Sequence, residues 1–231
     1  MDTVAQNNSC LNCPEKSLCF NMLSDEELTK IDNNKVVLKY KKGEIMAKQG
    51  GFVPQILYLQ QGLVKIYKEI NDTENLVLTI FPSGSLIGLP SLYSTAKMEY
   101  TVSALADSVI CAMDKTLFED FIKQNGEFAA AVITNMNNCL LYNFNRIKSL
   151  THKQMNGRLA ETFLFLADGI YKSDEFKLSL SRKDLAEFTG MSVMSVVRGI
   201  KDFKESGLIT DERGIIKILN REKLMKISVS G

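Results

Sequence analysis

A change of sequence pattern at Asp114 constrains the fold of this chain more than any other feature. Before it, residues 36–113 hold short apolar or alternating runs, such as VVLKY, QILYL and LVLTIF, separated by glycines. Such runs are typical of strands in a sandwich or jelly roll. After it, the apolar spacing is helical as far as Leu150, with a pause at residues 124–126. Because Asp114 is itself a suitable helix N-cap, the sequence predicts an α+β fold in which helices follow a β-domain.

Composition places the chain among ordinary globular proteins. Its 231 residues are 45% hydrophobic and 24% charged. No apolar run is long enough to span a membrane and no signal-peptide pattern is present, so we expect a cytoplasmic protein without a membrane partner. Thiols stay reduced in the cytoplasm, and a cysteine cluster there is more typical of a metal or redox site than of a disulfide framework.

The second helical stretch carries a seam with the three-four alternation of a two-helix coiled coil. The seam residues are Ile133, Met136, Leu140, Asn143, Ile147 and Leu150. The seam either packs against the protein's own β-domain or forms a symmetric dimer interface, in which the polar Asn143 fixes the register. The DNA-binding pattern that follows favours the dimer.

Residues 181–207 have the pattern of a helix-turn-helix, whose second helix can enter the DNA major groove. A first helix begins at Ser181, a turn follows at Gly190, and a second helix begins after Ser192 and stops at Gly207. The next residues, LITDERGIIKIL, predict two strands around a turn, which would make the domain a winged variant.

The side chains of the second helix suit a surface that faces the groove. Small, polar or basic residues on its N-terminal half and outer face are Ser192, Val193, Ser195, Arg198 and Lys201. Arg198 is the candidate base reader, because a guanidinium can bond both acceptors of a guanine edge; the alternatives are a phosphate contact or a solvated charge. All six arginines follow residue 145, so whatever the β-domain recognises, it does so without a guanidinium.

In this order the motifs resemble those of the family of the cyclic-AMP receptor protein and the fumarate and nitrate reduction regulator (CRP/FNR). The resemblance covers essentially the whole chain and rests on KKGEIMAKQG, LYLQQGLVKIY, the long helix and LSRKDLAEFTGMSVMSVVRGIKDFKESGLI. It implies a double-stranded β-helix sensor domain, a dimerisation helix and a winged helix-turn-helix. The implied protein is a homodimer that binds palindromic promoter DNA and contacts RNA polymerase. The expected segments are an N-terminal cysteine segment (1–30), the sensor (31–113), the helical dimerisation region (114–150) and the DNA-binding domain (151–231).

The sensor residues disfavour two effectors known in this family. The cyclic-nucleotide branch uses a Gly-Glu pair for the ribose and an Arg-Ser/Thr pair for the phosphate, whereas here Leu89 follows Gly88 and Lys97 is the only cation of the loop. A buried phosphate needs a charge-assisted partner, so we do not expect cyclic AMP. The only histidine, His152, lies outside the expected sensor, which disfavours haem bound through histidine but leaves haem bound through cysteine open.

Three of the five cysteines lie within ten residues, CLNCPEKSLC. Cys10, Cys13 and Cys19 are spaced C-x2-C-x5-C, as in the oxygen-sensing branch of the family, and Cys111 occupies the place of that branch's fourth cysteine. Four thiolates are what a [4Fe-4S] cluster requires. The resemblance implies that an intact cluster favours the DNA-binding dimer, and that oxygen converts or removes the cluster.

Other interpretations of the cysteines stay open. Four thiolates also suit zinc, and a cysteine pair can form a thiol redox switch. The cysteines could also be unliganded, with Cys111 buried as a small hydrophobe. A regulator without a cluster would be controlled by zinc, by a thiol switch or by a small molecule in the β-domain. We assign Cys139 to packing, and the absence of a catalytic constellation predicts that the protein is not an enzyme.

Two recognition-helix positions depart from the family pattern. Met194 stands where both founding members place a glutamate, and Val197 precedes Arg198. A carboxylate accepts a hydrogen bond from cytosine N4, whereas a thioether offers mainly apolar contact, for instance to a thymine methyl. We therefore expect Arg198 to keep a guanine while the neighbouring bases differ. The residues that match phosphate-contacting positions are Ser181, Arg182 and Ser192.

Overall fold

The computed structural model describes residues 9–52, 54–71, 73–93 and 97–230. The chain forms two compact units. One contains the described residues up to Glu69 together with Ile80–Leu141, and the other contains Ile70–Thr79 and the described residues from Tyr142 onward. The four segments expected from the sequence remain a prediction.

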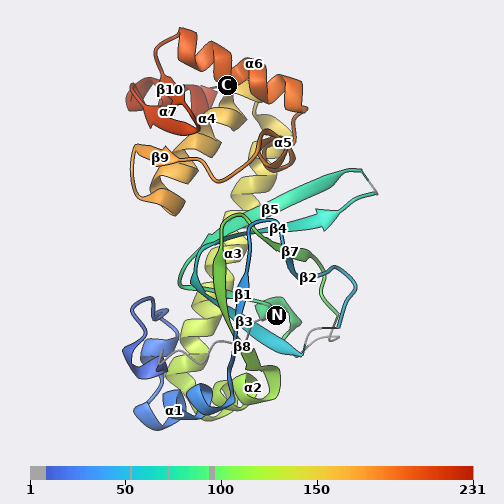
Figure 1. The fold of residues 1–231 in the computed structure, drawn as a ribbon, viewed down its shortest axis with the longest axis vertical. Helices are drawn as coiled ribbons and strands as arrows, with labels where there is room; N and C mark the ends of the chain where they lie inside the picture. The colour runs from blue at the N-terminus through green and yellow to red at the C-terminus, as the bar shows by residue number, and fades with distance from the viewer. Residues whose placement is uncertain (1–8, 53, 72, 94–96, 231) are drawn as a thin grey trace. The chain divides into compact units, whose positions relative to one another are not determined.

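A β-roll of two four-stranded sheets forms most of the first unit (Figure 1), although residues 75–79 of its fifth strand are counted with the second unit. Its strands are β1 (Val36–Tyr40), β2 (Ile45–Ala47), β3 (Gln55–Gln61), β4 (Leu63–Glu69), β5 (Asn75–Pro82), β6 (Ser85–Ile87), β7 (Thr101–Ala104) and β8 (Ser108–Asp114). The sheet orders are β1-β8-β3-β6 and β2-β7-β4-β5. The predicted jelly roll is confirmed, and its core includes the fully buried Ile56, Leu59 and Ile110.

Helices cover one side of the first sheet. They are η1 (Cys10–Asn12), η2 (Phe20–Met22), α1 (Asp25–Asn34), η3 (Leu89–Ser91), α2 (Lys115–Gln124) and α3 (Gly126–His152). The Asp114 carboxylate accepts from the backbone N–H groups of Thr116 and Leu117 at 2.8 and 3.1 Å, so the predicted cap is confirmed. Phe118 and Phe128 meet edge to face, 5.1 Å apart, and bury the start of α3.

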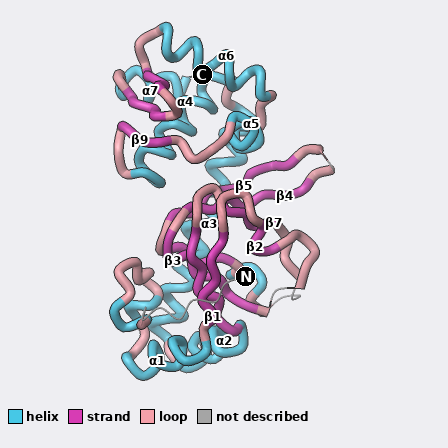
Figure 2. Tube along the Cα trace, viewed as in Figure 1, coloured by secondary structure: helices cyan, strands magenta, loops and turns pink. Residues whose placement is uncertain are grey.

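The second unit contains the winged helix-turn-helix (Figure 2). After the C-terminal part of α3 it consists of α4 (Met155–Phe165), the π-helix η4 (Leu166–Tyr171), β9 (Glu175–Lys177), α5 (Arg182–Thr189), α6 (Val193–Glu205), β10 (Ile209–Glu212), β11 (Ile215–Ile218) and α7 (Arg221–Ser230). The predicted helix pair and the β10–β11 hairpin are confirmed. The sheet order β10-β11-β9 adds a strand that the sequence pattern did not indicate.

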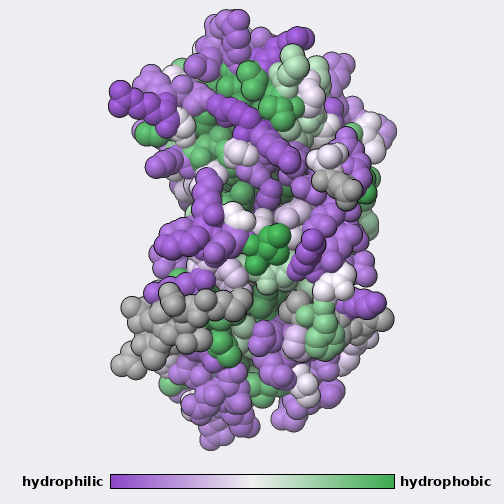
Figure 3. Space-filling model, turned by 45° about the vertical axis from the view of Figure 1, so that its right-hand side comes forward, coloured by the Kyte–Doolittle hydropathy of each residue, from purple (hydrophilic) through white to green (hydrophobic). Residues whose placement is uncertain are grey.

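On the face drawn in Figure 3, hydrophobic residues form small groups within a largely hydrophilic surface. Within the described ranges, no helix is both long and apolar enough to cross a membrane.

The β3–β4 turn provides a test of the roll's packing. A Cβ at Gly62 (φ +108°) would lie 2.2 Å from the Ser108 Oγ, whereas one at Gly43 (φ +91°) would meet no atom within 4 Å. We expect Gly62→Ala to lower the free energy of unfolding by about 3 kcal/mol and Gly43→Ala by about 1 kcal/mol, because only the former adds a clash to the backbone strain. Urea denaturation of both variants measures the difference, and equal losses would contradict the close approach of the turn to β8.

Candidate functional site

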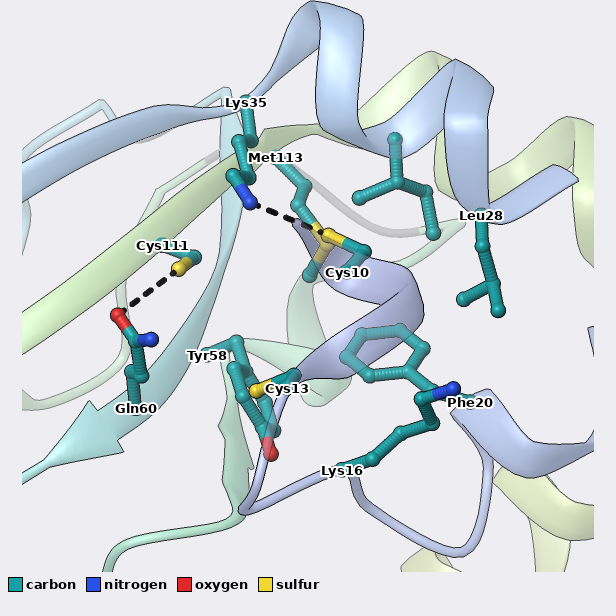
Figure 4. Close-up of a pocket in the computed structure, with 11 residues that line it drawn as sticks. Cys10, Cys13, Lys16, Phe20, Leu28, Lys35, Tyr58, Gln60, Cys111 and Met113 are labelled. Carbon is teal, nitrogen blue, oxygen red and sulfur yellow. Dashed lines mark hydrogen bonds between the residues drawn. The ribbon is translucent and has the colours of Figure 1, made fainter. Parts of the chain in front are cut away.

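Three of the four cysteines predicted to bind a metal line one small cavity, which we call the cysteine cavity (Figure 4). Its lining includes Cys10, Cys13, Cys111, Lys35, Tyr58 and Gln60. Cys10 begins η1, and Cys111 lies in β8 opposite residues of β1 and β3. The cavity volume is about 20 Å³, which is room for about one water molecule.

Cys19 does not line this cavity. It directly precedes η2, is 2% exposed, and packs in a hydrophobic cluster that also includes Phe20, Tyr58 and Cys111. In the part of the chain that the structure describes, no group of three or more His, Cys, Asp or Glu side chains is arranged to hold a metal ion. The structure thus brings three of the predicted ligands to one cavity and buries the fourth in the adjoining core.

A nearly buried ion pair holds Cys10 against α1. The Lys35 Nζ lies 2.5 Å from the Asp32 Oδ1 and 3.3 Å from the Cys10 Sγ, and the Cys10 backbone N–H donates to the same carboxylate oxygen at 3.2 Å. The Lys35 side chain is only 8% exposed. Sequence reasoning missed this pair, because an acid and a base three residues apart at a helix end are common on solvated surfaces.

Burial makes the cysteine thiols weak acids. It raises the pKa of Cys10, where the Lys35 ammonium offsets part of the effect, and it also raises the pKa of Cys19. Burial raises the pKa of Cys111 to about 11. These three thiols are therefore protonated near neutral pH, and a metal that takes them as thiolates displaces protons.

The chemistry of the donor set suits a thiolate-bound metal group, although the present volume does not admit one. Soft sulfur donors suit zinc and iron–sulfur clusters. Beside them lies the buried Tyr58 hydroxyl, with the backbone of Ser17 near it, and hydrogen bonds to sulfur are a recognised influence on such groups. Because the cavity holds about one water molecule, residues 10–19 must shift for a four-iron group to be bound.

The helix-turn-helix is held by α4. The turn residue Gly190 has φ +63°, and the Arg158 Nη1 donates to the carbonyl oxygens of Thr189 and Gly190 at 3.0 and 3.1 Å. A Cβ at Gly199 of α6 would lie 2.7 Å from the Leu159 Cδ2 of α4. The glycine therefore lets α6 pack closely on α4, and the position of the recognition helix is fixed within this unit.

Most of the predicted DNA-contacting residues of α6 are exposed. They are Ser192, Val193, Met194, Arg198 and Lys201, while Ser195 is half-buried. The Ser192 hydroxyl caps α6 by accepting from the Ser195 backbone N–H at 3.1 Å. Lys201 has a loose ion pair with Glu205 at 3.6 Å, in which both side chains are well exposed.

The two predicted contacts at the start of α5 already have partners within the protein. Ser181 forms a capping box with Asp184: its hydroxyl accepts from the Asp184 backbone N–H at 3.0 Å, and its own backbone N–H donates to the carboxylate at 2.8 Å. Arg182 pairs with Asp211 of β10. Both residues therefore contribute to the fold of the domain, and Arg182 would have to share its guanidinium to contact a phosphate.

Helix α3 exposes most of the predicted dimer seam. Ile133, Met136, Leu140 and Ile147 are between 41% and 59% exposed, and Asn143 is exposed as well. Leu150 differs, because it is half-buried and its Cδ2 lies 3.1 Å from the position of a Cβ on Gly190. The structure also exposes Leu141 and Phe144, which the heptad pattern did not include.

In the loop that corresponds to the nucleotide-binding loop of the cyclic-nucleotide branch, an apolar residue occupies the position of the glutamate that binds the ribose. Gly88 has φ +99°, and the Leu89 side chain that follows it is 4% exposed and packs in the same hydrophobic cluster as Cys111. Lys97 is exposed. The described residues of this loop therefore offer buried hydrocarbon where the cyclic-nucleotide branch offers a carboxylate.

A β-roll, a long helix and a winged helix-turn-helix are together the parts of a DNA-binding regulator. Residues 157–227 match the Crp-like helix-turn-helix domain, and residues 37–125 match the cyclic nucleotide-binding domain. The chain belongs to the CRP/FNR family of transcription regulators.

Curated relatives and solved structures agree with this assignment. The chain is 24% identical to the regulatory protein HlyX of Actinobacillus pleuropneumoniae, over 93% of this chain and 92% of that protein. It is 22% identical to the fumarate and nitrate reduction regulatory protein of Escherichia coli K12, over 95% and 90% of the two chains. The fold is similar to that of FixK2 from Bradyrhizobium japonicum, with a TM-score of 0.78 and 17% identity over 85% of this chain and 98% of that one.

The raised pKa of Cys111 predicts a pH-dependent contribution to stability. Its folded pKa of about 11 exceeds the ordinary value of 9.0, so between these pH values the unfolded chain loses a proton that the folded protein keeps, and stability falls as pH rises. Between pH 8 and pH 10 we expect wild type to lose about 1 kcal/mol more than Cys111→Ala. Urea denaturation under reducing conditions at both pH values measures this, and parallel losses in the two proteins would contradict it.

Proposed function

We propose that this regulator is a cytoplasmic homodimer that binds palindromic promoter DNA. It senses oxygen or redox state through a [4Fe-4S] cluster, and the cluster is bound by Cys10, Cys13, Cys19 and Cys111. The observation that carries the sensing proposal is the meeting of Cys10 and Cys13 with Cys111 at one cavity. These residues are about a hundred positions apart in the sequence, and a purely structural thiol needs no such neighbours.

The chain's own residues connect this site to the dimer helix. Cys111 lies three residues before Asp114, which ends β8 and caps α2, and α3 follows after Asn125. The hydrophobic cluster around Cys19 and Cys111 also contains Phe128 and Val132 of α3. A displacement of residues 10–19 therefore changes packing against the first turns of α3.

When bound, a [4Fe-4S] cluster would supply reactivity towards oxygen. The protein's part is to provide four thiolates, to exclude water with the side chains around the cavity, and to place Lys35 beside Cys10. A buried ammonium next to a thiolate ligand lowers the cost of placing negative charge there.

Anaerobic purification followed by absorbance spectroscopy and iron and sulfide analysis tests the cluster. We expect a broad band near 400 nm that bleaches in air, and we expect Cys13→Ser to lose it. Cys139→Ser is the matched control, because Cys139 is a half-buried cysteine of α3 outside the cysteine cavity. Zinc in place of iron, or a metal-free protein that forms a disulfide in air, would contradict the cluster and identify a zinc site or a thiol switch.

The dimer proposal is tested with a charge in the α3 seam. Leu140→Glu should convert the dimer into a monomer in sedimentation equilibrium at micromolar concentration, because a carboxylate would be desolvated at the centre of the interface. Met225→Glu on α7 is the control, since its exposure of 52% in a helix nearly equals the 49% of Leu140. A dimer that survives Leu140→Glu, or dissociates equally with both changes, would overturn the assignment of the seam.

A further inference from the structure

A second cavity lies in the unit that contains the helix-turn-helix, and neither the cysteine cavity nor the exposed face of α6 shares its residues. Its lining includes Tyr142, Asn145 and Arg146 of α3, Glu161 and Phe165 of α4, and Phe188 of α5, all of which belong to the second unit. We call it the α3–α5 cavity. Its volume of about 160 Å³ is close to that of an apolar cavity that holds benzene. It is therefore large enough for a small organic molecule.

Aromatic side chains form the walls of the α3–α5 cavity. The Tyr142 and Phe165 ring centroids lie 5.5 Å apart, and those of Phe165 and Phe188 lie 5.7 Å apart with 28° between the ring planes. Phe188 is 1% exposed, so its ring is held by the core of the domain. Flat apolar walls favour a flat apolar ligand, because aromatic rings attract one another at such distances.

Arg146 supplies a buried donor that the protein leaves without an acceptor. Its Cζ lies 4.1 Å from the centroid of the Phe188 ring, and its Nη2 donates to the Phe188 carbonyl oxygen. Its Nε is buried and has no hydrogen-bond partner among the described residues. Burial also lowers the pKa of this guanidinium. A buried N–H group without an acceptor is costly, so an acceptor that reaches it from the cavity would remove that cost.

The charges around the cavity favour an anionic acceptor. Glu161 is the acidic residue in the lining, but Ser149 donates to one of its oxygens and the Lys153 Nζ lies 2.8 Å from the other. The positive charge of Arg158 also acts on Arg146 and lowers its pKa further. A carboxylate near Arg146 would gain a charge-assisted hydrogen bond, whereas an ammonium group would be repelled.

We propose that the α3–α5 cavity binds a small aromatic carboxylate, with its ring between the aromatic walls and its carboxylate accepting from the Arg146 Nε. This inference does not depend on the cluster, and it adds a ligand site outside the β-roll. Because the ligand contacts α3, α4 and α5 at once, its binding stabilises the arrangement in which these three helices pack together.

The proposed dimer leaves this cavity accessible. Asn145 is the exposed residue of the lining named above, and it lies two residues from each of the seam residues Asn143 and Ile147. At about 100° per residue, it is about 160° away from both around the axis of α3. A ligand can therefore reach the cavity in the dimer as well as in the monomer.

Isothermal titration calorimetry of the full-length protein at one fixed salt concentration tests the inference, with benzoate as the probe. We expect a dissociation constant below about 1 mM, which is ordinary for a ligand of this size. Benzamide has the same shape without the charge, and it should bind about tenfold more weakly. Acetate has the charge without the ring and should not bind measurably.

Two variants locate the bound molecule. Asn145→Glu places a competing carboxylate beside Arg146 and should weaken benzoate binding about fivefold. Asn138→Glu is the matched control, because Asn138 is an exposed asparagine two helical turns earlier on the same side of α3 and does not line the cavity. Both positions are exposed, so neither change should disturb folding. Arg146→Met should abolish the preference for benzoate over benzamide.

Three results would overturn the inference. Equal affinities for benzoate and benzamide would mean that the cavity does not select an anion. Equal affinities of the Asn145→Glu and Asn138→Glu variants for benzoate would place the ligand elsewhere on the protein. No heat of binding from benzoate at about 10 mM would mean that the cavity holds only water, which would then be the acceptor for the Arg146 Nε.

Discussion

The central place of β8 in its sheet is the constraint on which the fold of the first unit depends. The strand pairs with β1 on one side and β3 on the other, and its residues from Ile110 to Met113 are all buried. Met113 and Cys111 pack in a hydrophobic cluster with residues of α1, α2 and α3. A one-residue slip of the register would move Cys111 to the opposite face of the sheet and expose the wrong side chains to the helices. The pairing of β8 therefore determines both where the thiol lies and where α2 begins.

Features that depend on local patterns could be predicted from the sequence. The strands of the roll, the cap at Asp114 and the helix-turn-helix between Ser181 and Gly207 follow from periodicity and from the hydrogen bonds that capping residues form with their near neighbours. Strand β9 is different, because its three residues carry too little pattern and are stabilised by pairing with β11.

Features that depend on long-range packing could not be predicted. Cys19 has the spacing of a ligand, yet in the structure it is buried among aromatic and aliphatic side chains, because Phe20 and Leu23 carry the same segment into the core. Arg182 matches a phosphate-contacting position, but Asp211 is its partner from a strand 29 positions away. A sequence pattern shows which groups a side chain can bond, and the fold decides which of them is near.

Helix α6 separates two tasks between its two faces. Val196, Gly199 and Ile200 build the core of the domain, and Gly199 allows the close approach to Leu159. Met194 and its exposed neighbours contribute little to that core, so substitutions among them cost little stability. During evolution the sites that such a protein recognises can therefore diverge by changes on one face, while the other face keeps the domain folded. A gene duplicate of this regulator could acquire new targets without first acquiring a compensating mutation in its core.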